Sequence, residues 1–135
     1  MITEDYVSFQ IAKLLKEKDF DKDVLVTDWW YDEKGDAHKH QNYSYSGAPV
    51  YYKETCCHAP TLQMAMKWLR EVHNLVIEPY RTACGDLYTV STVPYGSTKY
   101  DNSESFNGDD EDSGQWTTWE KACEDGVKYC LENLI

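Results

Sequence analysis

Residues 60–74, PTLQMAMKWLREVHN, are the most strongly patterned stretch of the sequence and predict its central helix. Pro60 suits a first helical turn, where its missing N–H would have no partner. On a helical wheel the apolar side chains cover an arc of about 200°. These side chains are Leu62, Met64, Ala65, Met66, Trp68, Leu69 and Val72. So wide an arc implies burial on two sides, so the helix is either central in the fold or meets a second subunit of a homodimer along its Met64 and Trp68 edge.

Two hairpins are predicted on either side of this helix. Residues 24–43 place β-branched and aromatic residues before a turn at Gly35, and a weaker return strand after it. Residues 74–95 form the second hairpin, with Gly85 at the turn and Pro79 indicating a strand at a sheet edge. The intervening residues 44–59 have turn residues, tyrosines and no helical period, so we expect an ordered loop with a short strand at residues 50–53.

Amphipathic helices are predicted at both ends of the chain. Thr3 can act as the N-cap of a helix over residues 4–18, and Phe9 points away from its apolar stripe, where it could meet a partner. Thr117 and Glu120 have the spacing of a capping box at the start of the last helix. The buried stripe of that helix is predicted to be Trp119, Cys123, Gly126, Val127, Cys130 and Leu134. The resulting α-ββ-α-ββ-α order predicts one α+β domain over residues 1–135, in which the two hairpins form a single antiparallel sheet packed by three helices.

The helical stretches also resemble a known group of proteins. At residues 59–74 (APTLQMAMKWLREVHN), 6–20 (YVSFQIAKLLKEKDF) and 122–135 (ACEDGVKYCLENLI), the chain resembles short uncharacterised proteins encoded by gut Bacteroidales bacteria and their phages. The resemblance covers roughly a third of the chain. It implies a small intracellular bacterial or phage protein with an accessory or binding role, and it carries over no activity, cofactor or site residue.

Composition restricts the compartment and the class of partner. The net charge is −11, from 24 acidic and 13 basic residues, and no basic patch is present, so we expect no direct binding of nucleic acid. No apolar run reaches the roughly 18 residues of a membrane span, and the acidic start of the sequence lacks the features of a secretory signal. Five cysteines, an odd number, fit a reducing compartment. We therefore expect a cytoplasmic protein that does not associate with membranes.

An acidic segment follows the second hairpin. Six carboxylates lie between Asp101 and Asp112, with no lysine or arginine among them. An EF-hand loop aligned on Gly108 would have Ser103 first and Gly114 twelfth, so both charged anchors of a calcium site are missing. We expect a hydrated, flexible loop over about residues 97–114 whose carboxylates engage nothing else. The alternative is an acidic decoy of a nucleic-acid-binding protein, which would need its carboxylates fixed along a helix or strand.

The most metal-like stretch is Cys56, Cys57 and His58, with two more histidines upstream. Structural zinc sites usually begin with two cysteines that are two to four residues apart, whereas adjacent cysteines normally diverge. A Cys–His nucleophile within this trio, or with His73, is a second reading, but neighbours in an extended segment rarely point together. We therefore predict no catalytic, cofactor-binding or metal-binding residues. The alternative is a metal- or thiol-dependent enzyme centred on Cys56, Cys57 and His58.

Four tyrosines fall within ten residues, interleaved with serines and a glycine. Rigid amphipathic rings among small residues are typical of protein-binding loops, although alternate tyrosines can instead pack on the protein's own sheet. We therefore predict a non-enzymatic accessory protein that acts by protein–protein binding. The predicted interaction surface consists of Tyr43, Tyr45, Tyr51, Tyr52, Met64 and Trp68.

Overall fold

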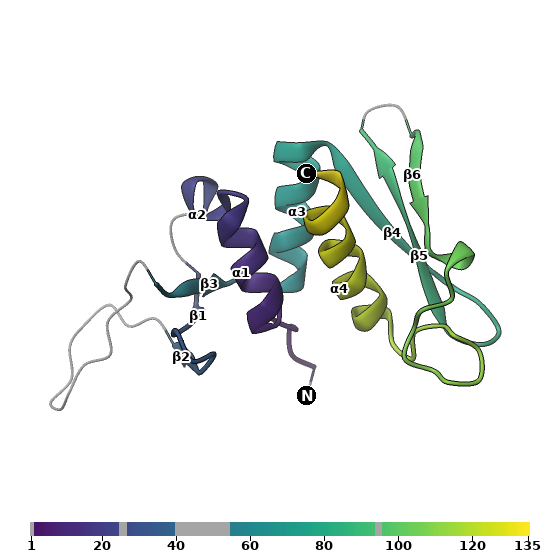
Figure 1. Cartoon of the computed structure of the whole chain (residues 1–135), viewed down its shortest axis with the longest axis horizontal. Helices are drawn as coiled ribbons and strands as arrows, with labels where there is room; N and C mark the ends of the chain where they lie inside the picture. Colours follow the sequence, from purple (N-terminus) through teal and green to yellow (C-terminus); the bar gives the residue numbers. More distant parts are fainter. Residues whose placement is uncertain (1, 25–26, 40–54, 94–95) are drawn as a thin grey trace, which may run out of the picture. The chain divides into compact units, whose positions relative to one another are not determined.

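The computed structural model describes residues 2–24, 27–39, 55–93 and 96–135 (Figure 1). The chain divides into two compact units, Met1–Thr61 and Leu62–Ile135. Over the described ranges the fold is mixed α/β, with four α-helices and two antiparallel three-stranded sheets.

Unit 1 contains two helices and the first sheet. Its elements are α1 (Phe9–Glu17), α2 (Phe20–Asp23), β1 (Trp29–Tyr31), β2 (Ala37–Lys39) and β3 (Cys57–Ala59). The sheet order is β2-β1-β3, so the predicted hairpin is confirmed as β1–β2 and its central strand pairs with β3 as well. Neither β3 nor α2 was predicted from the sequence, and the strand predicted at residues 50–53 lies outside the described residues.

The start of α1 differs from the prediction. The helix begins at Phe9, after Ser8, whose hydroxyl accepts a hydrogen bond from the amide of Ile11 at 3.3 Å. Thr3 is therefore not the N-cap. The chain before Ser8 pairs with the end of β3 instead: the amide of Val7 donates to the Pro60 carbonyl at 3.1 Å, and Val7 is fully buried. The predicted cap at Thr3 is not used, because the backbone pairing of Val7 with Pro60 keeps this part of the chain extended and buries the Val7 side chain.

Unit 2 has the order α-β-β-β-α. Its main elements are α3 (Leu62–His73), β4 (Leu75–Arg81), β5 (Asp86–Thr92), β6 (Thr98–Asp101) and α4 (Trp119–Tyr129). A 3-10 turn follows β6 at Asn102–Glu104, and a π-helical turn continues α4 at Cys130–Leu134. The sheet order is β4-β5-β6, which confirms the β4–β5 hairpin and the position of β4, with Pro79, at an edge.

The predicted single sheet is wrong. In unit 1, strand β1 pairs with β2 along one edge and with β3 along the other. In unit 2, strand β5 pairs in the same way with β4 and β6. No edge of either inner strand remains for joining the two hairpins. The sequence analysis missed β3 and β6 because strands of three and four residues are too short to show alternation.

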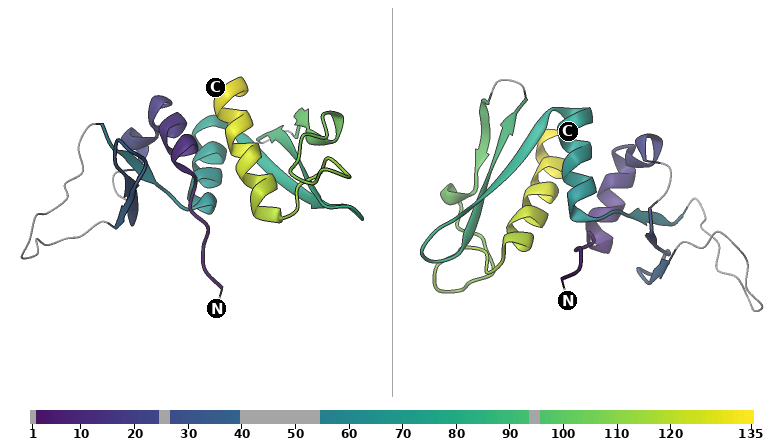
Figure 2. Two further views of the ribbon diagram at one scale, coloured as in Figure 1. Left: turned by 60° about the horizontal axis from the view of Figure 1, so that its bottom comes forward. Right: turned by 180° about the vertical axis from the view of Figure 1, so that it is seen from behind.

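Both helices of unit 2 cover one face of its sheet (Figure 2). At the closest approach of α4 to the sheet, a Cβ on Gly126 would lie 2.7 Å from the Ile77 side chain. Beside it, the hydroxyl of the fully buried Tyr88 donates to the Asp125 carboxylate of α4 at 2.6 Å. The sheet and α4 are thus joined by the close contact at Gly126 and by a partly buried hydrogen bond.

The predicted buried stripes of α3 and α4 are largely confirmed. On α3, Met64 and Val72 are 40% and 44% exposed, so the buried arc is narrower than the pattern implied. On α4, Trp119 is the first helical residue and is 40% exposed, and the helix is capped by Thr118, one residue later than predicted. In the described ranges no helix is both long and apolar enough to cross a membrane.

Candidate functional site

The predicted interaction surface is only partly described. Its four tyrosines, Tyr43, Tyr45, Tyr51 and Tyr52, lie outside the described residues. Of the remaining two residues, Met64 is 40% exposed, whereas Trp68 is 3% exposed and its ring meets the edge of His73 at 4.6 Å between centroids. The Met64 side chain therefore offers surface for contact and the Trp68 side chain does not. The tyrosine surface stays a prediction.

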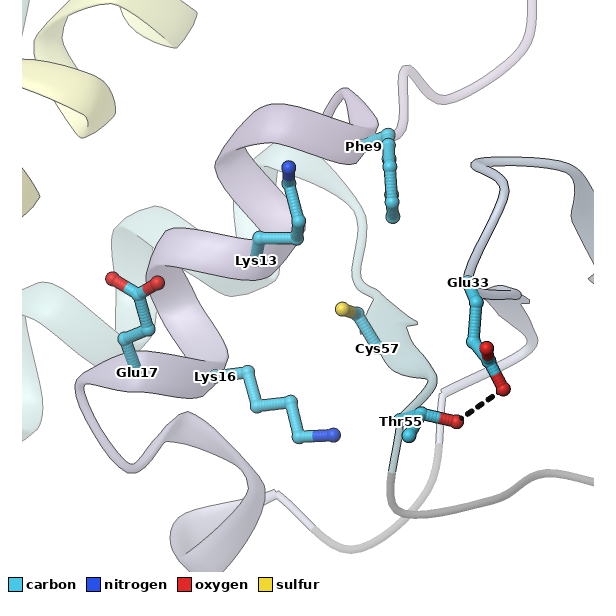
Figure 3. A pocket seen from close by; sticks show the side chains of 7 residues that line it. All are labelled: Phe9, Lys13, Lys16, Glu17, Glu33, Thr55 and Cys57. Atoms are coloured by element: carbon cyan, nitrogen blue, oxygen red, sulfur yellow. Dashed lines mark hydrogen bonds between the residues drawn. The ribbon is translucent and has the colours of Figure 1, made fainter.

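Unit 1 contains an open pocket of about 590 Å³ (Figure 3). We call it the Cys57 pocket, and it is lined by Phe9, Lys13, Lys16, Glu17, Glu33, Thr55 and Cys57. Helix α1 supplies the first four of these residues, which share one face at helical spacing, because its opposite face is buried by Ile11, Ala12 and Leu15. The β1–β2 turn supplies Glu33, the first residue of β3 supplies Cys57, and Thr55 lies two residues before that strand.

The Phe9 ring forms one wall of the Cys57 pocket. It packs beside Tyr31 of β1, with 5.6 Å between ring centroids, and against Gly35 of the β1–β2 turn. The Lys13 ammonium lies 4.7 Å from the centre of the same ring, within the range of a cation–π contact. The helical wheel placed Phe9 away from the apolar stripe as a possible contact with a partner, and in the structure its ring contacts Tyr31 and Gly35 of the same unit.

Hydrogen bonds tie the sides of the Cys57 pocket together. The Thr55 hydroxyl donates to the Glu33 carboxylate at 2.7 Å, which joins the β1–β2 turn to the chain entering β3. The Lys16 ammonium donates to the Cys56 carbonyl at 2.6 Å, which joins α1 to the same segment. The two bonds link α1, the β1–β2 turn and the chain entering β3, and Figure 3 shows the one between Thr55 and Glu33.

The thiol of Cys57 is poorly suited to nucleophilic chemistry. The residue is 4% exposed, and burial raises the pKa of its thiol, although Lys16 acts in the opposite direction. Because the thiolate is the reactive form of cysteine, a raised pKa leaves little of that form at neutral pH.

The trio Cys56, Cys57 and His58 does not converge on one site. Cys57 is paired with Tyr31 and His58 with Trp30 in the β1–β3 register, so the two side chains point to opposite faces of the sheet. Cys57 lines the pocket, while the His58 Nδ1 lies 3.2 Å from the Thr27 hydroxyl. A Cys57–His58 nucleophile pair is therefore wrong. In the part of the chain that the structure describes, no three potential metal ligands gather.

The upstream histidine, His38, lies in strand β2 and contacts the β1–β2 turn. The His38 Nε2 lies 2.8 Å from the Asp32 Oδ2, and its ring stacks on Trp30 at 4.6 Å between centroids. The other carboxylate oxygen of Asp32 accepts from the amides of Lys34 and Asp36. The hydrogen bond from His38 and these turn amides lower the pKa of Asp32. Through these contacts His38 stabilises the β1–β2 hairpin.

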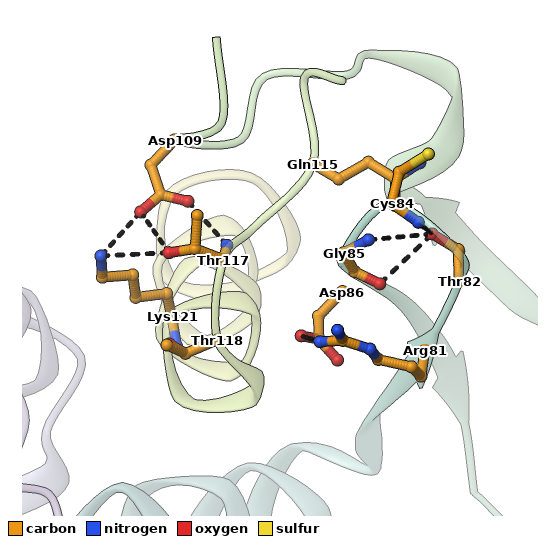
Figure 4. Close-up of polar contacts among 10 residues, drawn as sticks. All are labelled: Arg81, Thr82, Cys84, Gly85, Asp86, Asp109, Gln115, Thr117, Thr118 and Lys121. Carbon is orange, nitrogen blue, oxygen red and sulfur yellow. Dashed lines mark hydrogen bonds and ion pairs between the residues drawn. The ribbon is translucent and has the colours of Figure 1, made fainter. Parts of the chain in front are cut away.

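Three carboxylates of the acidic segment accept hydrogen bonds, contrary to the expectation from sequence: Asp101, Asp109 (Figure 4) and Asp110, which accepts from the Asp112 amide at 2.9 Å. Asp109 accepts from the Thr117 amide at 2.8 Å, from the Thr117 hydroxyl at 2.9 Å and from the Lys121 ammonium at 2.7 Å. Asp101 accepts from the Ser103 amide at 3.0 Å and the Tyr80 hydroxyl at 3.1 Å. The start of α4 exposes amides that favour a nearby negative charge, and Asp109 supplies it.

The far end of the acidic segment is joined to the β4–β5 turn. The Asp86 amide donates to the Trp116 carbonyl at 2.8 Å, and the return bond is 2.9 Å. The Thr82 hydroxyl donates to the Gln115 side chain, and a Cβ on Gly85 would lie 2.6 Å from the Trp116 carbonyl oxygen. These hydrogen bonds fix the end of the segment against the β4–β5 turn.

Two polar regions therefore stand out, the Cys57 pocket in unit 1 and the anchored acidic segment in unit 2. Only the pocket combines a hollow with side chains that differ in character, namely an aromatic wall, a buried thiol and charges of both signs. Comparisons of the chain with protein-family models, with curated proteins and with solved structures found no match.

Proposed function

We propose that the protein acts by binding another protein, and that the Cys57 pocket receives a short segment of this partner. The observation that carries the proposal is the make-up of the pocket, in which the Phe9 ring stands among flexible lysine and glutamate side chains. Interface residues that contribute most to affinity are anchored in such partly apolar hollows, and the surrounding charges select the partner. The protein would serve as a cytoplasmic accessory factor of a bacterium or its phage, as the resemblance implies.

The same geometry supports recognition over catalysis. A thiol enzyme needs a base within hydrogen-bond reach of its cysteine, or a lowered pKa of the thiol. His58 lies on the other face of the sheet from Cys57, and burial raises the pKa of the Cys57 thiol. The side chains around this thiol are better suited to contact than to proton transfer.

The predicted tyrosine surface is a neighbour of the pocket along the chain. Tyr51 and Tyr52 precede Thr55, which lines the Cys57 pocket, by only a few positions. We propose that both contribute to one binding surface of unit 1.

Affinity capture with a charge reversal tests the pocket. The purified chain is crosslinked in a lysate of gut Bacteroidales cells, and captured proteins are quantified by mass spectrometry. Lys13→Glu places a negative charge at the pocket and should lower the recovery of a specific partner about tenfold, which corresponds to about 1.4 kcal/mol. Lys67→Glu is the matched control, because it makes the same charge change at an exposed position of α3 that does not line the pocket. Equal recovery with both variants would contradict the proposal.

The tyrosines are tested in the same assay. Changing Tyr45, Tyr51 and Tyr52 together to serine should abolish capture of the partner that Lys13→Glu weakens. Unchanged capture would remove the tyrosines from the binding surface and leave the pocket as its only proposed part.

A further inference from the structure

Phe106, in the acidic segment, departs from two local rules. Its φ is +48°, a left-handed backbone conformation in which a bulky residue is a genuine outlier. Its side chain is 53% exposed, although phenylalanine is among the residue types most often buried. Neither feature favours folding, because the backbone conformation costs stability and an exposed ring gains little from burial. Positions that keep such a conformation concentrate at functional sites.

The surrounding chain fixes the backbone of Phe106. Its amide donates to the Asn102 carbonyl at 3.4 Å. Asn102 is itself fully buried, and its side chain accepts from the Trp116 indole at 3.1 Å. Gly114 lies directly against Phe106, since a Cβ on that glycine would be 2.5 Å from the Phe106 carbonyl oxygen. The exposed ring therefore stands on a backbone that is held from two sides, and a partner that covers it would have little chain to order.

Exposed carboxylates accompany this ring. Glu104 precedes Phe106 by two residues and Asp112 precedes Gly114 by two, so the Cα atoms of each pair are within about 7 Å of each other. The side chains of Glu104, Glu111 and Asp112 are exposed, and among the described residues their carboxylates accept no hydrogen bond and form no ion pair. The segment contains no lysine or arginine that could offset them. The ring is thus presented in a negative field.

This field restricts what can cover the ring. Aromatic side chains are enriched in protein interfaces, and the charges around them decide which partners approach. A nucleic acid or an anionic lipid surface would be repelled by these carboxylates and by the net charge of −11. A second copy of this chain would be repelled for the same reason. The complementary partner is a basic protein segment.

We infer that Phe106 is the anchor of a second protein-binding surface, on the acidic segment of unit 2, and that this surface takes a basic segment whose apolar side chains close over the ring. The carboxylates alone would attract cations without selecting among them, whereas the fixed ring requires an apolar counterpart. The inference does not depend on the proposed function of the Cys57 pocket, which lies in unit 1.

Three peptides test the inference directly. The full chain, labelled with ¹⁵N, is titrated with N-acetyl-Lys-Leu-Lys-Leu-Lys-amide, with an analogue in which serine replaces leucine, and with one in which glutamine replaces lysine. Backbone amides of residues 104–114 are followed by NMR. We expect the first peptide to shift these amides and to bind about tenfold more tightly than either analogue, because each analogue lacks the apolar or the ionic contribution. Added salt should reduce mainly the advantage over the glutamine analogue.

Substitution of the ring assigns the apolar contribution. Phe106→Asn should abolish the advantage of the first peptide over the serine analogue, because asparagine tolerates the left-handed conformation but offers no ring. Val72→Ala is the control, since it removes an apolar side chain that is 44% exposed on α3, and it should leave that advantage unchanged.

Substitution of two carboxylates assigns the ionic contribution. Glu104→Gln combined with Asp112→Asn should remove most of the advantage over the glutamine analogue. Glu71→Gln combined with Glu124→Gln makes the same change in net charge on α3 and α4, and it should have a much smaller effect. Equal effects of the two double variants would overturn the inference, because the attraction would then come from net charge alone.

Thermal unfolding distinguishes a binding role of the ring from a structural one. Phe106→Asn should unfold at the wild-type temperature or above it, because asparagine adopts the left-handed conformation more readily than phenylalanine. A lower unfolding temperature would make the ring part of the fold and would contradict the inference. Equal affinity of wild type for the three peptides, or an unchanged preference for leucine in Phe106→Asn, would contradict it as well.

Discussion

Gly35 in the β1–β2 turn has φ of +91°, a left-handed conformation that residues with a side chain rarely adopt. Its missing side chain also leaves room for the Phe9 ring, since a Cβ there would lie 2.8 Å from the ring's Cδ2 atom. One residue thus permits both the turn and the aromatic wall of the Cys57 pocket. The cost of a side chain at this position is therefore local strain together with displacement of the wall.

We predict that Gly35→Ala lowers the free energy of unfolding by about 1–3 kcal/mol. Thermal unfolding followed by circular dichroism measures the change. Gly96→Ala is the control, because a Cβ at Gly96 meets no atom within 4 Å, and it should unfold at the wild-type temperature. Equal effects of the two substitutions would mean that Gly35 contributes no specific constraint.

Asp125 of α4 is a partly buried carboxyl group in unit 2. Burial raises the pKa of its carboxyl group, against the opposing effect of the hydrogen bond from Tyr88. A carboxyl whose pKa is higher in the folded chain binds its proton more tightly there than in the unfolded chain. Its contribution to stability is therefore fully present below the unfolded pKa of about 3.9 and is lost as pH rises through the folded value.

We predict that Asp125→Asn removes this loss of stability on raising the pH, while its amide oxygen still accepts from the Tyr88 hydroxyl. Urea unfolding at a series of pH values from 4 to 7 measures the free energy of unfolding of each variant. Glu124→Gln on the same helix is the control for the loss of one charge. Parallel pH profiles for wild type and Asp125→Asn would show that the folded and unfolded pKa values of Asp125 are alike.

At the scale of elements, two side chains accept hydrogen bonds from backbone amides at the start of α4. The Thr118 hydroxyl accepts from the Lys121 amide at 3.1 Å, which satisfies one N–H of the first turn. Asp109, from the acidic segment, accepts from the amide and hydroxyl of Thr117 and from the Lys121 ammonium. The helix start and the acidic segment therefore stabilise each other.

We predict that Asp109→Asn destabilises unit 2 by about 1 kcal/mol at neutral pH, the scale of a lost helix cap. The hydrogen bond from Lys121 is the main cause that lowers the pKa of Asp109 to about 2. The contribution of its charge is present above the unfolded pKa of about 3.9 and is lost as the pH falls through about 2. Glu111→Gln removes a charge from the same segment at an exposed position and should have little effect at any pH; a matching loss there would assign the effect to net charge.

At the scale of the whole molecule, the five cysteines separate into two classes. Cys84, in the β4–β5 turn, is exposed, whereas Cys56, Cys57, Cys123 and Cys130 are buried. Burial raises the pKa of Cys123 and Cys130 to about 12, and it raises the pKa of Cys57 as well. The folded chain should therefore present one readily reactive thiol.

We predict that iodoacetamide modifies Cys84 rapidly in the native chain and the buried cysteines only as the chain unfolds. Intact-mass spectrometry over time counts the modified thiols, and Cys84→Ser should remove the rapid phase. Rapid modification of Cys57 would show that its thiol is accessible from the pocket and more acidic than its burial implies.

What the sequence alone determined is local. The helical period predicted α3, and turn residues at Gly35 and Gly85 predicted the hairpins β1–β2 and β4–β5, because contacts between residues a few positions apart decide these elements. The start of the last helix was misplaced by a single residue: the capping-box spacing favoured Thr117, whereas Thr118 is the N-cap and the Thr117 hydroxyl donates to Asp109 instead.

The tertiary structure decided the rest. Each sheet is completed by a short strand, β3 or β6, that pairs with the inner strand of a hairpin. Strands this short show no sequence pattern from which their pairing with a distant segment could be predicted. The start of α1 depended on the pairing of Val7 with Pro60, and the separation of Cys57 from His58 depended on the register of β3 with β1. The Cys57 pocket draws its residues from three segments, so its existence followed from their assembly and not from any one of them.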